Sequence, residues 1–220
     1  MNDRPIKRRA FNSRLALIAA GGYALPAIGA NLSATPEQVE GPFHPVNTQS
    51  DTDMDLTRIA GNDRVATGEP ILVHGRVLDE NGEPLENALV DVWQANHFGR
   101  YAHHRDPNTA PLDPNFQGWG LLRTDEQGLY RFKTIKPGAY PLEFLGDRGM
   151  RCRHIHYKVS HPSRKTLTTQ MYFEGDPLIE QDMEIAKAPA DKRHLLIASA
   201  VKDEDTGLPL YTFDVVLAAG

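Results

Sequence analysis

The chain has 220 residues, a formal net charge of −5 and a single cysteine, Cys152. With 40% apolar and 24% charged residues, the composition excludes a collagen-like, coiled-coil or wholly disordered chain. The acidic balance argues against a nucleic-acid surface, and one cysteine excludes an internal disulfide, a Cys-based zinc site and an iron–sulfur cluster. A metal ion in this protein must therefore be bound by His, Tyr or carboxylate side chains.

The first thirty residues differ in composition from the rest of the chain. Five basic residues stand before an apolar stretch over 15–30: Arg4, Lys7, Arg8, Arg9 and Arg14. The run Arg8-Arg9-Ala10-Phe11 resembles a twin-arginine export signal, so we predict that residues 1–30 are a signal segment and that the protein is exported to the periplasm. The alternative is an uncleaved arm on a protein that stays in the cytoplasm. No later apolar run reaches about 18 residues, so we expect no membrane span in the mature form.

The rest of the chain is predicted to form an irregular arm over 31–68 and one β-rich domain over 69–220. Short apolar runs between turn residues predict a short helix near 177–186 and strands over 71–78, 88–95, 129–135, 155–160, 166–173, 195–201 and 210–217. The Asn81-Gly82 turn signal predicts that the first two strands form a hairpin. We therefore predict an all-β antiparallel β-sandwich with little helix and with long irregular loops over 31–68 and 97–117.

The first chemical feature is the pair His154 and His156, separated by Ile155. Because side chains alternate between the two faces of a strand, both imidazoles lie on the same face, close enough to share one ion. Taken alone, such a pair is more often solvated or satisfied by its neighbours than bound to a metal. The two histidines therefore need support from other segments.

Five segments together supply that support: VDVWQANHFGRY (90–101), APLDPNFQGWG (110–120), TIKPGAYPL (134–142), RCRHIH (151–156) and TQMYFEGDP (169–177). From about residue 40 to the C-terminus the chain resembles the intradiol ring-cleaving dioxygenases, most of all the β-chain branch of the protocatechuate 3,4-dioxygenases. The resemblance implies a transthyretin-like β-sandwich that binds non-haem Fe(III) through two tyrosines and two histidines. The positions that match these ligands are Tyr101, Tyr140, His154 and His156.

These residue types suit ferric iron on chemical grounds. Fe(III) is a hard Lewis acid that prefers anionic oxygen donors such as phenolate over thiolate. A tyrosine with an ordinary pKa of about 10 is ionised at neutral pH only beside a strong cation, so metal and phenolate stabilise each other. Two phenolates and one hydroxide balance the charge of the ion, while the neutral imidazoles add none.

The resemblance also implies a reaction and further site residues. Both atoms of O2 enter a protocatechuate-like catechol, and the ring opens between its two hydroxylated carbons. Tyr140 is implied to be the ligand that the substrate displaces, while Tyr101 stays bound. Arg151 matches an arginine that stabilises the anionic ring, with a surface salt bridge as its alternative role. Gln170 and Trp93 match substrate-binding positions, although they are otherwise an ordinary strand amide and a core tryptophan.

Some positions depart from the family pattern. Cys152 and Arg153 stand where the protocatechuate enzymes usually have Pro and Ala, and Leu142 replaces an aromatic residue. In those enzymes a second, homologous chain helps to build each site, so we expect either a hetero-oligomer with such a chain or a homo-oligomer. His103 and His104 are expected to be solvated. Arg153 is expected to point away from the site, with a contact to a substrate carboxylate as its alternative. Residues 40–45 resemble the family's N-terminal loop near the pocket mouth, and the role of His44 within them stays open.

Two rival functions remain from the residues themselves. Residues 75–90 (GRVLDENGEPLENALV) also resemble strands of exported, non-catalytic transthyretin-like binding modules, which need no metal. A zinc ion bound by His154, His156, one tyrosine and a water is the other alternative. The coincidence of two tyrosines with two histidines favours the iron enzyme, because a binding module has no reason to retain all four.

Overall fold

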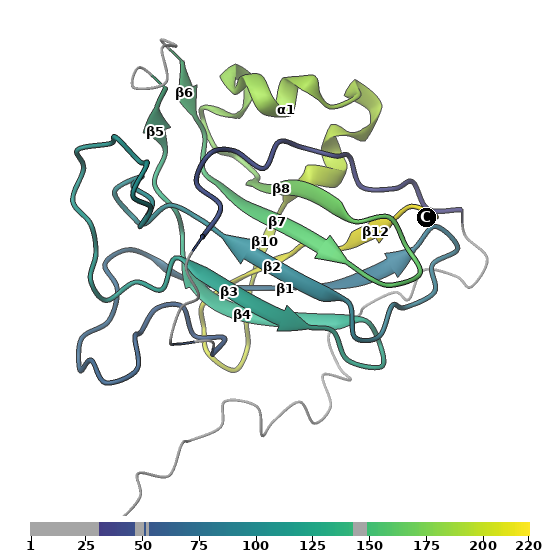
Figure 1. The fold of residues 1–220 in the computed structure, drawn as a ribbon, viewed down its shortest axis with the longest axis horizontal. Coiled ribbons are helices and arrows are strands. Elements are labelled where there is room, and N and C mark those ends of the chain that lie inside the picture. The colour runs from purple at the N-terminus through teal and green to yellow at the C-terminus, as the bar shows by residue number, and fades with distance from the viewer. Residues whose placement is uncertain (1–30, 47–50, 52, 143–148) are drawn as a thin grey trace, which may run out of the picture.

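A computed structural model describes residues 31–46, 51, 53–142 and 149–220 (Figure 1). The predicted signal segment 1–30 lies outside these residues. The strands are β1 (Pro70–Asp79), β2 (Leu89–Trp93), β3 (Trp119–Arg123), β4 (Leu129–Ile135), β5 (Tyr140–Pro141), β6 (Met150–Arg151), β7 (His154–Ser160), β8 (Leu167–Phe173), β9 (Ile197–Ala198), β10 (Ala200–Lys202), β11 (Pro209–Thr212) and β12 (Val215–Leu217). The helical segments are η3 (Ile179–Gln181), α1 (Met183–Lys187) and η4 (Ala190–Leu196). No helix among the described residues is long and apolar enough to cross a membrane.

Two five-stranded sheets form the body of the protein. In the first sheet β1 pairs antiparallel with β4 on one side and parallel with β11 and β12 on the other, while β10 extends the sheet beyond β11. The second sheet has the order β3-β2-β7-β8-β9, and its last pair is parallel. The predicted all-β sandwich with little helix is confirmed, but its sheets are mixed rather than purely antiparallel.

Alternation of buried and exposed residues along each strand explains why the sheets face each other. The inward side chains of both sheets belong to one buried cluster, in which Phe132 of β4 meets Tyr157 of β7. Each fully buried large apolar side chain contributes about 1.5–3 kcal/mol relative to exposure. Burial of this shared face therefore holds the two sheets together.

The predicted hairpin of the first two strands is wrong. The turn itself forms, and the amide of Gly82 donates to the carbonyl oxygen of Asp79. The segments on either side of the turn, however, share only one isolated β-bridge, between Leu78 and Pro84. The two strands lie in different sheets because β1 is paired along both edges, which leaves no edge for β2. β2 pairs instead with β3 and β7.

Other segments also differ from the sequence-based expectations. β3, at Trp119–Arg123, was not expected, although its alternating burial is typical of a half-buried strand. The first residues of the strand expected over 195–201 belong to the 3-10 helix η4. The strand expected over 210–217 is divided into two strands, β11 and β12. The helix expected near 177–186 is present as η3 and α1.

The N-terminal arm, residues 31–46, packs against both sheets. The amide of Thr35 donates to Val216 of the first sheet at 3.1 Å, and that of Gln38 donates to Thr168 of the second at 2.8 Å. Farther along, Leu56 is completely buried in the shared core. The described part of 31–68 therefore packs as part of the same body as residues 69–220.

Candidate active site

The outer face of the second sheet carries a row of polar and aromatic residues. Ile155 and Tyr157 point into the core, so His154 and His156 on the same strand point outward. His156 lies opposite Trp93 of β2 and Gln170 of β8. The candidate site is therefore a cross-strand row on the face away from the core.

Two loops bring the tyrosines to this row. Tyr101 lies in the long loop that follows β2. Tyr140 is the first residue of β5 and lies opposite Arg151 of β6. The Tyr101 hydroxyl oxygen lies 3.1 Å from His156 Nε2 and 3.3 Å from His154 Nε2, and the Tyr140 oxygen lies 3.4 Å from His154 Nε2. All four side chains are at least 95% buried. The structure thus brings together the four predicted ligand residues.

Two glycines allow the tyrosine loops to approach each other. Gly99 has φ +79°, and a Cβ on it would lie 2.5 Å from the carbonyl oxygen of Ala139, next to Tyr140. A Cβ on Gly138 would overlap the carbonyl oxygen of His97 and the amide nitrogen of Gly99. Backbone atoms cannot yield as a flexible side chain can. The short contact between loops 96–101 and 138–140 therefore requires glycine at both positions.

Replacing Gly138 with alanine is expected to force the two loops apart and to lower the free energy of unfolding by about 1–3 kcal/mol. Thermal or urea unfolding measures this loss. Gly118→Ala is the matched control, because its Cβ would meet its nearest neighbours at an ordinary 3.5 Å. Equal stability of the two variants would contradict the close-packing argument.

The hydrogen bonds of His154 fix its tautomer. Its Nδ1 lies 2.7 Å from the carbonyl oxygen of Cys152, which accepts but cannot donate. Nδ1 therefore carries the proton, and Nε2 presents its lone pair to the two tyrosine oxygens. A backbone carbonyl that orients the ring in this way is the usual support of a metal-binding histidine.

Burial sets the protonation states of the four side chains. It lowers the pKa values of His154 and His156 well below the usual range, and nearby Arg151 lowers them further, so both rings are neutral. Burial also raises the pKa of Tyr101, which Tyr140 raises further, and it raises the pKa of Tyr140 despite the opposing charge of Arg151. Ionised phenolates therefore require an additional cation at this site.

The spacing of the four donor atoms fits a single metal ion. The three N···O distances of 3.1–3.4 Å lie at or beyond the upper end of the usual hydrogen-bond range of about 2.7–3.2 Å. Ligand atoms placed tetrahedrally about 2.0–2.1 Å from one metal ion are about 3.3 Å apart. Among the described residues, no group of three or more His, Cys, Asp and Glu side chains is placed to hold a metal. Any ion held here therefore depends on the tyrosines.

Trp93 supports the ring of His156. The two rings are stacked, with centroids 4.8 Å apart and planes at 5°, and Trp93 is almost fully buried. His44 also contacts Trp93: the two rings meet edge-on, with their centroids 4.6 Å apart. His44 Nε2 lies 3.0 Å from a carboxylate oxygen of Asp91. Trp93 is thus a packing partner of His156. His44, whose role the sequence left open, belongs to the N-terminal arm and packs against Trp93.

Arg151 lies at the centre of a buried polar network rather than in a surface salt bridge. Its Nε donates to Asp182 Oδ2 at 2.9 Å, and its Nη2 donates to Gln170 Oε1 at 2.5 Å and lies 3.5 Å from the Tyr172 hydroxyl. Burial opposes its charge, but Tyr140 and Asp182 outweigh burial and raise its pKa. Arg151 is thus a fixed cation beside Tyr140.

Asp182 was not expected from the sequence, yet it organises this network. Besides Arg151, its carboxylate accepts the amide of Cys152 at 2.9 Å and caps α1 by accepting the amide of Glu184 at 2.9 Å. An aspartate directly before a short helix is a recognisable N-cap signal. The ion pair of Asp182 with Arg151, 31 positions earlier, has no comparable signal in the sequence.

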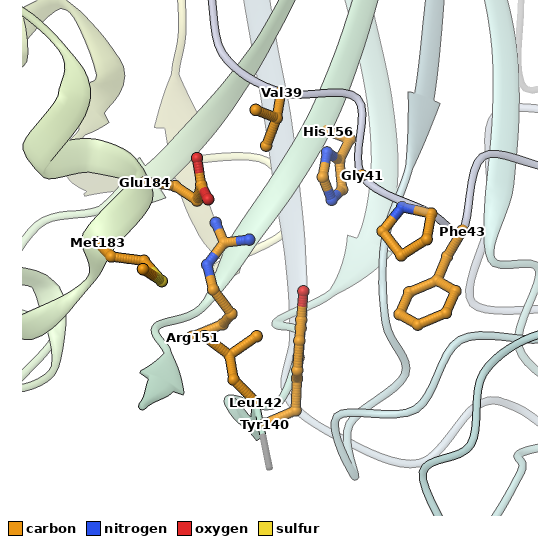
Figure 2. A pocket seen from close by; sticks show the side chains of 10 residues that line it. Val39, Gly41, Phe43, Tyr140, Leu142, Arg151, His156, Met183 and Glu184 are labelled. Carbon is orange, nitrogen blue, oxygen red and sulfur yellow. The ribbon is translucent and has the colours of Figure 1, made fainter. Parts of the chain in front are cut away.

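A cavity of about 210 Å³ opens beside these residues (Figure 2). Its lining comes from the arm, β5, β6, β7 and α1: Val39, Gly41, Pro42, Phe43, Tyr140, Leu142, Arg151, His156, Met183 and Glu184. In Figure 2 the hydroxyl end of Tyr140 points into the cavity, with Arg151 and Glu184 on one side and Phe43 on the other. Pockets for drug-sized ligands are roughly 300–1,000 Å³, so this one suits a single aromatic ring. The arm lies at the cavity as the resemblance of residues 40–45 implied, whereas α1 is a wall element that the sequence had not indicated.

Several of the other residues lie apart from this cavity. Tyr101 faces a second cavity of about 190 Å³, together with His103 and His104. His104 is exposed as expected, whereas His103 is half-buried, and the two rings are tilted by 31° with their centroids 4.6 Å apart. Arg153 lines neither of these two cavities, in line with the expectation that it points away from the site, and it pairs with Asp176 at 3.1 Å.

Comparison with known proteins gives concordant matches. The family described as "Dioxygenase" matches residues 39–219. The protocatechuate 3,4-dioxygenase beta chain of Burkholderia cepacia is 45% identical over 82% of this chain and 79% of its own length. Catechol 1,2-dioxygenase 2 of Acinetobacter lwoffii is 36% identical over 69% of this chain, which spans 56% of that relative. The fold matches 3-chlorocatechol 1,2-dioxygenase of Rhodococcus opacus 1CP with a TM-score of 0.66 at 24% identity, covering 86% of this chain and 74% of that one.

Proposed function

The chain belongs to the intradiol ring-cleaving dioxygenase family, and from this premise we propose that Tyr101, Tyr140, His154 and His156 hold a non-haem Fe(III) ion. The protein is an enzyme that incorporates O2 into a catechol-type aromatic compound and opens the ring between the two hydroxylated carbons. The predicted enzyme class is therefore confirmed, and the alternative of a non-catalytic binding module is wrong. The observation that carries the iron proposal is the chain of three contacts, 3.1–3.4 Å long, that links the four buried donor atoms.

Iron bound at these residues supplies a Lewis acid and a template for the two oxygens of the catechol. The chain supplies the rest of the chemistry. The cavity admits one ring and surrounds it with Val39, Phe43 and Leu142, which keep water from its faces. The ring thus meets the donor atoms in an apolar setting, where the electrostatic interactions are stronger than in water.

The two tyrosines are proposed to have different roles. Tyr140 lines the cavity, so an incoming catechol meets its hydroxyl oxygen first. Tyr101 faces the other cavity and contacts both histidines. We infer that Tyr140 would be the exchangeable ligand, whose phenol oxygen would accept a proton from the substrate hydroxyl, while Tyr101 would be the permanent one.

Arg151 is proposed to stabilise the negative charge that develops on the bound ring. Its guanidinium lies on the cavity wall and is held by Asp182 and Gln170, so little reorganisation is needed as charge develops. Gln170 is completely buried and donates to the Val39 carbonyl at 2.9 Å. We propose that Gln170 positions Arg151 and the arm and does not itself contact the substrate.

The finer identity of the substrate and the assembly are also proposals. The name of the Burkholderia cepacia relative makes protocatechuate one candidate, and the Acinetobacter lwoffii relative makes catechol another. The relative is a beta chain, which supports assembly with a homologous second chain, although a homo-oligomer remains the alternative. We further propose export through residues 1–30, which N-terminal sequencing of the protein from its native cells tests.

Colour tests the iron proposal directly. Loading the purified protein with ferric iron is expected to turn it red-brown through tyrosinate-to-Fe(III) charge transfer, and chelation of the metal is expected to remove both the colour and catechol-dependent O2 uptake. Visible absorption and an oxygen electrode measure the two effects. Zinc-loaded protein is the control and stays colourless. An iron-loaded protein without colour would contradict ligation by the two tyrosines.

A further inference from the structure

The charges on the cavity wall discriminate between possible ring substituents. Among the ten lining residues, which all belong to the described part of the chain, two carry full charges, namely Arg151 and Glu184. Most of the others are apolar, including Val39, Leu142 and Met183. The response of the cavity to a charged substituent therefore depends on these two side chains.

Arg151 is already committed to protein partners. The edge formed by Nε and Nη2 donates to Asp182 and Gln170, and the Asp182 carboxylate balances its charge at 2.9 Å. A carboxylate is recognised best by two parallel bonds from a guanidinium edge. Nε bonds Asp182 and Nη2 contacts both Gln170 and Tyr172, so neither edge of the guanidinium keeps two free donors. Arg151 is thus poorly placed to neutralise a carboxylate on the substrate.

Glu184 brings a negative charge to the same wall. It lies in the first turn of α1, where Asp182 fixes its backbone amide, and its side chain is 14% exposed. Lys187 holds its carboxylate at 2.8 and 3.0 Å but is itself 58% exposed and is not a lining residue. In Figure 2 the side chains of Glu184 and Arg151 lie on the same side of the cavity. The lining therefore presents a carboxylate acceptor, and the cation that pairs with it, Lys187, lies outside the lining.

We propose that Glu184 is a specificity-determining residue that selects catechols whose ring substituent is neutral or donates a hydrogen bond and disfavours those that carry a carboxylate. A second carboxylate in this cavity meets a like charge across an apolar gap, where screening is weak. A hydroxyl or amide group instead donates to Glu184. The proposal rests on the proposed function, because it places the ring in this cavity.

A matched pair of substrates tests the charge alone. Protocatechuate (3,4-dihydroxybenzoate) and 3,4-dihydroxybenzamide have nearly the same shape, but only the first is charged. The iron-loaded enzyme is expected to show a kcat/KM for the amide about tenfold above that for the acid. Glu184→Gln is expected to raise the ratio of kcat/KM for the acid to kcat/KM for the amide about tenfold. Lys187→Gln is expected to lower that ratio, because it leaves the Glu184 carboxylate without its cation.

Binding provides a readout that does not depend on turnover. The single-hydroxyl analogues 4-hydroxybenzoate and 4-hydroxybenzamide are titrated by calorimetry, and the amide is expected to bind about tenfold more tightly. The control variant is Glu180→Gln, which makes the same change in net charge at an exposed residue in η3 and is expected to leave both ratios unchanged.

The outcomes separate this proposal from the proposed function. Absence of O2 uptake with every catechol would contradict the ring-cleaving function, while the binding pair would still report on Glu184. Efficient cleavage combined with a preference for the acid, or with equal ratios in the wild type and Glu184→Gln, would overturn the role of Glu184 alone.

Discussion

Tyr101→Phe is expected to lose most of its iron and, with it, the visible colour and the ring-cleaving activity. The substitution removes the oxygen that lies 3.1 Å from His156 Nε2 and 3.3 Å from His154 Nε2. Loss of residues that merely orient a ligand lowers metal affinity about 10–100-fold, so loss of a ligand is expected to exceed that range. Metal analysis after gel filtration against a weak chelator measures the retained iron.

Tyr140→Phe is the matched comparison, because it removes the same group from the other tyrosine. Its oxygen is near one histidine nitrogen in the structure and faces the cavity. We expect this variant to keep more iron than Tyr101→Phe and to turn over slowly, because the substrate loses the phenolate that accepts its proton. Equal iron loss in the two variants would contradict the division of roles.

Asp182→Asn is expected to lower the free energy of unfolding by about 3–5 kcal/mol, because it leaves the buried charge of Arg151 without its counter-ion. Asparagine keeps an oxygen to cap α1, so the loss reports chiefly on the charge. Activity is expected to fall as well, since Arg151 loses the partner that positions it. Urea unfolding and O2 uptake measure the two effects.

The control for this change is Asp191→Asn, an exposed acid in the first turn of η4. It removes one negative charge at the surface and is expected to change stability by no more than about 0.5 kcal/mol. If Asp182→Asn were as mild as this control, the buried network would not depend on the ion pair.

The sequence was most informative where the chemistry depends on local pattern. His154 and His156 share a face because of strand alternation, and the resemblance to the intradiol family implied Tyr101 and Tyr140. All four meet in the structure. The strand runs were also largely found, because short apolar segments between turn residues carry a clear signal.

Long-range packing explains what could not be predicted. The Asn81-Gly82 turn formed, but local pattern does not reveal that β1 has no free edge for β2. Asp182 acts through Arg151, 31 positions away in the chain, and the arm residue Phe43 reaches the cavity only because the arm crosses the sheet. Such roles depend on which segments meet in three dimensions, and no single segment contains that information.

The parallel pairing of β1 with β11 and β12 has a consequence for the order of folding. β1 begins at residue 70, but the strands that complete one of its edges span 209–217. Contacts so distant in sequence form slowly, because a long loop must close before they are made. Until those last strands arrive, β1 exposes an unpaired and largely apolar edge, which favours association with other chains. A nascent chain that stalls before residue 209 is therefore the species most exposed to aggregation.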